Sequence, residues 1–186
     1  MRNDTLRRGI PAMTAVLVVV TAALAAAYGQ TKAAWMLTAA ISFGTTGYHF
    51  LMRLLVGGAV RAIYRDRFLW ERKWFRPRKW EAGFYRFLRV CRWKDKMPTY
   101  RPEEFAVSGN SLEAVTQAGC IAELGHEMIL LLSFAPLLTI PAFGAAGVFW
   151  STSLLAALVD SVFVIMQRYN RPRFLRVLEK ERGRHG

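Results

Sequence analysis

Histidines and carboxylates interrupt the apolar stretches of this 186-residue sequence, and their types could support acid–base chemistry. Glu123 and His126 are three residues apart, so in a helix they would share one face. A neutral imidazole beside a carboxylate is the usual base for activating a hydroxyl group. We therefore expect His126 to be the base and Glu123 to orient its ring. A buried structural hydrogen bond between the two is the alternative.

Further ionisable residues occur within apolar segments, where they are costly and therefore need a reason. His49 and Arg53 are separated by four residues, as are Glu123 and Glu127. Asp160 stands alone in the last apolar run. His49 is a second candidate base, and the choice between it and His126 stays open. There are simpler alternatives for two of the others. Asp160 could only neutralise Arg53 or a histidine, and Glu127 could face the lipid headgroups.

Four apolar runs must position these residues. They cover residues 10–28, 33–57, 118–140 and 143–166. Each is long enough to cross about 30 Å of hydrocarbon as a helix, and lipid leaves no water to satisfy an open backbone. The sequence therefore predicts an all-α fold: an integral membrane four-helix bundle that forms a single domain over residues 1–186.

Lysine and arginine counts predict the orientation of the chain. The N-terminal tail has 3, the segment 58–119 has 14 and the tail from Arg168 has 7, whereas the two short turns hold one at most. Basic loops stay on the cytoplasmic side. We expect a multi-pass protein of the cell membrane with both termini in the cytoplasm. All six ionisable residues of the spans would then lie in the inner half of the bilayer.

The long loop over residues 61–117 interleaves aromatic and basic side chains, and Pro77, Pro98 and Pro102 break it into pieces. Such a composition suits amphipathic helices in the membrane interface, where rings settle at headgroup depth. Nucleic-acid binding is the weaker interpretation of this pattern between membrane spans. The net charge of +13 predicts an anionic neighbour, either lipid headgroups or a phosphate-bearing substrate.

We expect no resident metal and no permanently bound cofactor. The chain has only three histidines, and its cysteines lack the spacing of a zinc site. A Glu-x-x-His pair also occurs in di-iron bundles, but these need two such pairs.

Three segments resemble a known family. They are AELGH at 122–126, RWKDKMP at 92–98 and QRYNRPR at 167–173. Their order and spacing over roughly the last hundred residues are similar to those of the glycosyl-4,4'-diaponeurosporenoate acyltransferase family, whose enzymes act in carotenoid biosynthesis. QRYNRPR is the most specific of the three. His49 has no counterpart in this resemblance.

The resemblance implies a membrane acyltransferase that moves a fatty acyl group from a thioester donor, such as acyl-CoA, to a hydroxyl group. The acceptor would be a lipid or glycolipid, such as a glycosylated carotenoid, at the inner leaflet. The His-x-x-x-x-Asp signature of many membrane acyltransferases is absent. Arg53 or a backbone amide could stabilise the oxyanion. Residues expected to bind the donor or substrate are Trp93, Lys94, Lys96, Glu127, Asp160, Gln167, Arg168, Asn170, Arg171 and Arg173.

Two other functions remain open at this point. A small membrane methyltransferase would use S-adenosylmethionine at the same face of the membrane, although the high positive charge fits a carrier with several phosphates better. A non-enzymatic lipid-binding protein would use the basic tail as an anchor on anionic lipid. The sequence names no protein partner.

Overall fold

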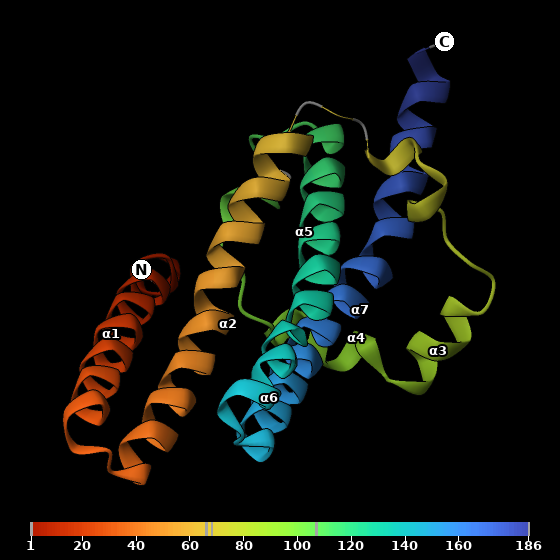
Figure 1. Cartoon of the computed structure of the whole chain (residues 1–186). Helices are drawn as coiled ribbons and strands as arrows, with labels where there is room; N and C mark the ends of the chain where they lie inside the picture. Colours follow the sequence, from red (N-terminus) through yellow and green to blue (C-terminus); the bar gives the residue numbers. More distant parts are fainter. Residues whose placement is uncertain (1, 66, 68, 107, 186) are drawn as a thin grey trace. The chain divides into compact units, whose positions relative to one another are not determined.

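The computed structural model describes residues 2–65, 67, 69–106 and 108–185, and every regular element in these ranges is a helix. The four long helices are α1 (Arg2–Thr31), α2 (Ala34–Tyr64), α5 (Leu112–Leu132) and α7 (Ala146–His185) (Figure 1). The shorter α-helices are α3 (Glu81–Phe87), α4 (Val90–Trp93) and α6 (Ile140–Phe143). The prediction of an all-α protein is confirmed.

Three helical segments of the described chain are long and apolar enough to cross a membrane: Leu6–Thr31, Leu112–Phe143 and Ala146–Lys180. The fold is therefore that of an all-α membrane protein. Helix α2 contains the predicted span 33–57 but is not among these three, because Gly44, Gly47 and His49 belong to a less apolar stretch. Four spans in a single domain, and their orientation, stay predictions.

The third predicted run, 118–140, is a continuous helix only in its first part. Helix α5 ends at Leu132, and a 3-10 helix (Ala135–Thr139) and α6 follow. Pro136 stands at the start of the 3-10 helix, where its missing N–H costs no internal hydrogen bond. The chain turns at Gly144 and Ala145, which both have positive φ, before α7 begins.

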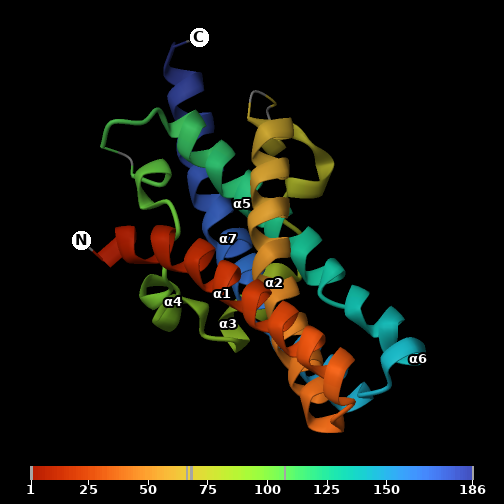
Figure 2. The same ribbon diagram turned by 60° about the vertical axis from the view of Figure 1, so that its left-hand side comes forward.

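The described residues form two compact units. The first unit comprises Met1–Val56 and Met128–Asp160. Figures 1 and 2 show α1 beside the part of α2 that belongs to this unit, joined to it by a short turn. Glycine allows the close approach, because a Cβ at Gly47 would lie 3.3 Å from the Cβ of Leu17. A larger side chain at this position would push the two helices apart.

The second unit comprises Gly57–Glu127 and Ser161–Gly186. Its buried core joins Leu69, Trp70 and Phe75 to Cys120 of α5 and Leu178 of α7. The Gln117 side chain fixes the segment that follows α2. Its Oε1 accepts from the backbone N–H of Leu69 at 3.0 Å, and its Nε2 donates to the carbonyls of Tyr64, at 2.6 Å, and Arg67.

The predicted interfacial segment is folded as a series of short helices in this second unit. Arg89 links α3 to α4 in the left-handed region, with φ 48°. Further 3-10 helices cover Leu69–Glu71, Lys73–Phe75, Lys94–Lys96 and Pro102–Glu104. Large aromatic side chains remain exposed along the segment, including Trp80 at 57% and Phe87 at 82%. Such exposure agrees with rings that lie in the membrane interface.

Candidate functional site

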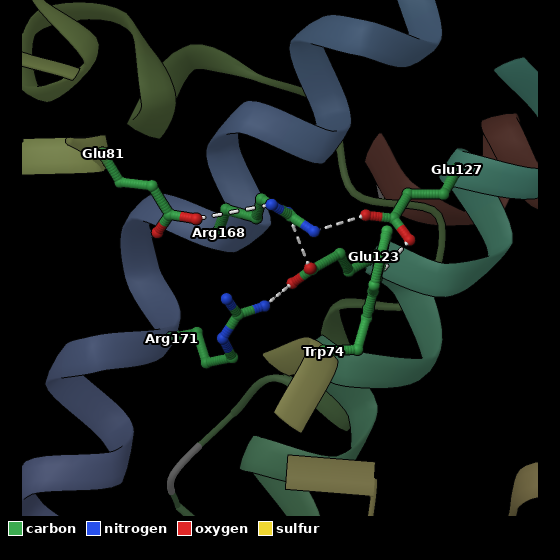
Figure 3. Close-up of polar contacts among 6 residues, drawn as sticks. All are labelled: Trp74, Glu81, Glu123, Glu127, Arg168 and Arg171. Carbon is green, nitrogen blue, oxygen red and sulfur yellow. Dashed lines mark hydrogen bonds and ion pairs between the residues drawn. The ribbon is translucent and has the colours of Figure 1, made fainter. Parts of the chain in front are cut away.

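Two helices of the second unit supply the central polar residues. Glu123 and Glu127 lie four residues apart on α5, and Arg168 and Arg171 lie three residues apart on α7. These spacings put each pair on one face of its helix. Figure 3 shows the two faces turned toward each other, with the carboxylates and the guanidinium groups in direct contact.

Glu123 is fully buried and is held by both arginines. Its Oε1 accepts from Nε of Arg168 at 2.9 Å, and its Oε2 accepts from Nη1 of Arg171. A buried carboxylate needs such partners, because an unpaired one is strongly disfavoured away from water. The prediction that Glu123 orients His126 remains untested, and the contacts described here give Glu123 a second role as the anchor of two arginines.

Arg168 joins three carboxylates. Besides Glu123, its Nη2 donates to Glu127 at 2.8 Å and its Nη1 donates to Glu81 at 3.3 Å. The guanidinium also lies over the Trp74 ring, 5.5 Å from the centroid, and the Trp74 indole donates to the second oxygen of Glu127 at 2.8 Å. Only arginine offers a planar fork of donors that can serve three acceptors together. We call Glu81, Glu123, Glu127, Arg168, Arg171 and Trp74 the Arg168 network.

His126 lies on α5, where it falls between Glu123 and Glu127 in the sequence. It is half-buried, and its ring stacks on Phe163 of α7 with 4.7 Å between centroids and 8° between planes. The flat stack fixes the plane of the imidazole, which is what a base needs in order to meet a substrate proton in one orientation.

A pocket of about 290 Å³ in the second unit brings two of the predicted motifs together. Lys94 comes from the segment 92–98, whereas Gln167, Asn170 and Arg171 come from 167–173. Met166 and Phe174 add apolar surface. Asp95 also lines the pocket and forms an ion pair with Lys94, so the pocket combines two cations, one carboxylate and two amides with an apolar wall.

Arg171 is the cation of this pocket with donors to spare. It is only 4% exposed and lies over the Phe75 ring, 5.5 Å from the centroid. Its Nη1 binds Glu123, but Nε and Nη2 have no hydrogen-bond partner among the described residues. Buried donors normally find acceptors. An anionic or carbonyl group in the pocket would supply them.

Other predicted binding residues lie outside this pocket. The Trp93 indole donates to the carbonyl of Leu88 at 3.1 Å, and its role in donor binding stays a prediction. Lys96 is exposed and does not line the pocket. Arg173 is exposed, donates to the Tyr169 hydroxyl at 3.1 Å and lines a different pocket.

The first unit holds the remaining predicted residues. Arg53 forms an ion pair with Asp160 and donates to the carbonyl of His49 at 3.2 Å. Asp160 is fully buried, and so is Ser153, which lies seven residues earlier on the same helix, α7. His49 is 4% exposed, and neither ring nitrogen has a hydrogen-bond partner among the described residues.

Three residues of the site escaped the sequence analysis: Glu81, Trp74 and Tyr85. Burial raises the pKa of the Tyr85 phenol, and the charge of the neighbouring Glu81 raises it further. Glu81 did carry a signal, because it is the single acid between Glu71 and Asp95 in a strongly basic segment. Nothing in the local pattern showed that its partner would be Arg168.

Comparison with known proteins decides the family. The model of the glycosyl-4,4'-diaponeurosporenoate acyltransferase family matches residues 71–180. The chain belongs to this family. No curated protein and no solved structure matches the chain.

Membership confirms the resemblance seen in the sequence motifs and identifies the protein as an acyltransferase of the membrane. Every member of the Arg168 network and every residue of the pocket that contains Arg171 lies within the matched range. The family match favours acyl transfer over the methyltransferase and the non-enzymatic alternatives. Residues 1–70, which include His49 and Arg53, lie outside the match.

Proposed function

We propose that this protein transfers a fatty acyl group from a thioester donor, such as acyl-CoA, to a hydroxyl group of a lipid or glycolipid at the inner leaflet. One observation carries the proposal. The pocket of the second unit is lined by Lys94 and Arg171, which come from two motifs of the family resemblance, and Arg171 is bound to Glu123 of the third motif. Residues far apart in sequence thus meet around a single pocket.

The pocket suits the polar part of an acyl thioester. A carrier such as coenzyme A bears several phosphates, and arginine and lysine are the usual phosphate ligands. Arg171 has two buried donors free for an acceptor, and Lys94 adds a second cation, whose ammonium group is paired with Asp95 of the same pocket. Gln167 and Asn170 can hydrogen bond the amide groups of the carrier arm.

His126 is the proposed base. It takes the proton of the acceptor hydroxyl, and the oxygen attacks the thioester carbonyl to form a tetrahedral intermediate. The C–S bond then breaks, the new ester forms, and the leaving thiolate takes the proton back from the imidazolium. The stack on Phe163 holds the ring in one plane during both proton transfers.

Arg168 has a positioning role in this proposal rather than a direct contact with phosphate. Three carboxylates already occupy its donors, so its charge is compensated within the network. Its contacts fix Glu123 and Glu127 on either side of His126 along α5. Loss of Arg168 would therefore disturb the base indirectly.

Lipid analysis tests the proposal. We would express the full chain, extract the membrane lipids and search by mass spectrometry for species that differ by one fatty acyl group. The wild type should form such a species, and His126→Ala should not. His49→Ala distinguishes the two candidate bases, because it should retain the activity if His126 is the base. Full activity of His126→Ala in a well-folded protein would contradict the assignment.

Incubation with labelled donors separates the reaction classes. Purified protein in proteoliposomes should incorporate label from an acyl thioester, and none from labelled S-adenosylmethionine. Transfer of a methyl group instead would overturn the proposed reaction.

A further inference from the structure

A second pocket of the second unit, of about 420 Å³, has no part in the proposed acyl transfer. Helix α3 supplies Glu81 and Tyr85, one turn apart, and α7 supplies Tyr169, Arg173 and Arg176. Arg78 and Arg86 complete the basic lining. We call this cavity the arginine pocket.

The charge of the arginine pocket points to an anion. Arg78, Arg86, Arg173 and Arg176 line it against a single acid, Glu81, which is itself bound to Arg168. Arg78 lies over the Trp74 ring and Arg173 over the Tyr169 ring, at 5.6 and 5.1 Å from the centroids. Aromatic rings restrict the guanidinium groups without neutralising them, which favours binding of a phosphate.

Glu81 adds a requirement for a hydrogen-bond donor. It is 2% exposed, and its Oε1 accepts from Arg168 at 3.3 Å. Its Oε2 is buried and has no hydrogen-bond partner of standard geometry among the described residues, although the Tyr85 hydroxyl, one turn along α3, interacts with the same carboxylate. A buried carboxylate oxygen without a donor is destabilising. A ligand hydroxyl would satisfy it, whereas a bare phosphate would repel it.

The surroundings of the pocket place it at headgroup depth. Trp80, Phe84 and Phe87 of this segment are 57%, 40% and 82% exposed, and such rings settle at the membrane interface. The same helix, α3, carries Glu81 and Tyr85. The apolar part of α7 that is long enough to span a membrane precedes Arg168, and Tyr169, Arg173 and Arg176 of the pocket follow directly after it. A lipid headgroup is thus the anion that such a pocket would meet.

We infer that the arginine pocket binds the headgroup of an anionic phospholipid that carries a hydroxyl group, as a glycerol headgroup does. The arginines bind the phosphodiester, and Oε2 of Glu81 accepts from the hydroxyl. This inference goes beyond the proposed acyl transfer and does not depend on it, because no residue of the donor pocket or base is required.

The test compares two anionic lipids of equal charge, one with and one without hydroxyl groups in its headgroup. The full chain in neutral detergent is titrated with phosphatidylglycerol, with phosphatidylmethanol, which has the same charge but no headgroup hydroxyl, and with phosphatidylcholine. Native mass spectrometry measures the bound fraction. We expect phosphatidylglycerol to bind most tightly, phosphatidylmethanol about tenfold more weakly, and phosphatidylcholine weakest. Phosphatidylethanolamine, whose ammonium group could also reach Glu81, should bind no better than phosphatidylcholine.

Exposed residues provide variants that should fold normally. Arg86→Gln combined with Arg173→Gln should weaken phosphatidylglycerol binding by about tenfold or more. Lys79→Gln combined with Arg92→Gln removes two exposed charges of the same segment that do not line the pocket, and should leave binding unchanged. Equal effects of the two changes would show only a general attraction to anionic lipid and would overturn the assigned pocket.

Two further outcomes would also overturn the inference. Equal binding of phosphatidylglycerol and phosphatidylmethanol would remove the role assigned to Glu81. Displacement of the lipid by inorganic phosphate at a similar concentration would show that the pocket recognises a soluble anion instead. Neither outcome would affect the proposed acyl transfer, whose assay measures a different reaction product.

Discussion

Arg168 donates its Nε–H to Oε1 of Glu123 across 2.9 Å, although 45 residues separate the two in sequence. The same guanidinium holds Glu81 and Glu127, so one arginine of α7 orders carboxylates from α3 and α5. The stability of this region should therefore depend on Arg168 more than on the other arginines of the basic tail.

Replacement of Arg168 by methionine tests this dependence. The change leaves the buried Glu81 without its cation and Glu123 with Arg171 alone, and breaking a buried pair costs about 3–5 kcal/mol. We expect the free energy of unfolding in mild detergent to fall by about 3 kcal/mol, with loss of acyl transfer. Arg168→Lys should recover only part of the stability and part of the acyl transfer, because the point charge of lysine cannot serve three acceptors.

The exposed Arg92 is the matched control for this experiment. Arg92→Met removes the same charge from the same unit and should leave the denaturation midpoint within error of the wild type. A midpoint for Arg168→Met that also matches the wild type would contradict the stabilising role of the network.

Trp74→Phe separates the hydrogen bond of the indole from its ring. The variant keeps an aromatic face beneath Arg168 but removes the donor to Glu127 at 2.8 Å. A single hydrogen bond to a charged group is worth about 1.5–3 kcal/mol, and the 52% exposure of Trp74 places this bond at the low end or below. We expect a loss of about 1 kcal/mol, measured by denaturant titration. A loss as large as that of Arg168→Met would show that the indole contributes more than this one hydrogen bond.

The donor pocket gives a kinetic prediction. Lys94→Gln and Arg171→Lys should each raise the KM for an acyl-CoA by about tenfold, because a charged hydrogen bond to phosphate is weakened. The KM for an acyl-pantetheine, which lacks phosphates, should change little. Lys79→Gln is the control, since this exposed lysine does not line the pocket. Equal increases in the KM for acyl-CoA and in the KM for acyl-pantetheine would indicate that these residues have a role other than phosphate binding.

Tyr85 gives a prediction for alkaline pH. Burial and the nearby Glu81 raise the pKa of this phenol above its ordinary value of about 10. Above about pH 10 the unfolded chain therefore loses this proton while the folded protein keeps it. The free energy of unfolding should then fall as the pH rises toward the folded pKa. Below pH 10 this contribution is fully present and constant.

Thermal melts between pH 8 and 11 measure the effect. The stability of Tyr85→Phe should decrease less steeply above pH 10 than that of the wild type. Tyr100→Phe, at a tyrosine that is 36% exposed, serves as the control and should follow the wild type. Identical slopes for all three proteins would contradict the burial of a protonated Tyr85.

The ion pair of the first unit suits a double-mutant cycle. Arg53→Met should destabilise the protein by about 3 kcal/mol, because it leaves the buried Asp160 without its cation. Arg53→Met combined with Asp160→Leu should regain most of that loss. If the double variant is no more stable than Arg53→Met alone, Asp160 has a role other than pairing with Arg53.

The sequence predicted the helices well, because apolar runs with basic flanks are a strong signal. The predicted runs 10–28, 33–57 and 143–166 fall almost entirely within α1, α2 and α7. The exception is 118–140, where Pro136 interrupts the helix after Leu132. Pro136 lies within the run, so the α-helix ends before the far end that the apolar pattern predicts.

The site was predicted only in part, for a physical reason. Helical spacing shows which residues of one helix share a face, and it placed Glu123 with Glu127 correctly. It cannot show which residues of another helix meet that face. The arginines of α7 were therefore expected to bind phosphate, whereas Arg168 binds three carboxylates. Glu81 was missed because its partner lies 87 residues away.

The order of synthesis gives the Arg168 network a consequence for biogenesis. Glu123 and Glu127 leave the ribosome 45 and 41 residues before Arg168, an interval of about 2–9 s at about 5–20 residues per second. During this interval α5 carries carboxylates whose arginine partners do not yet exist, and a carboxylate without its cation is costly to place in hydrocarbon. If both helices span the membrane, as the sequence predicts, we expect stable insertion of α5 to wait for α7, so that the translocation machinery releases the two as a pair rather than one after the other.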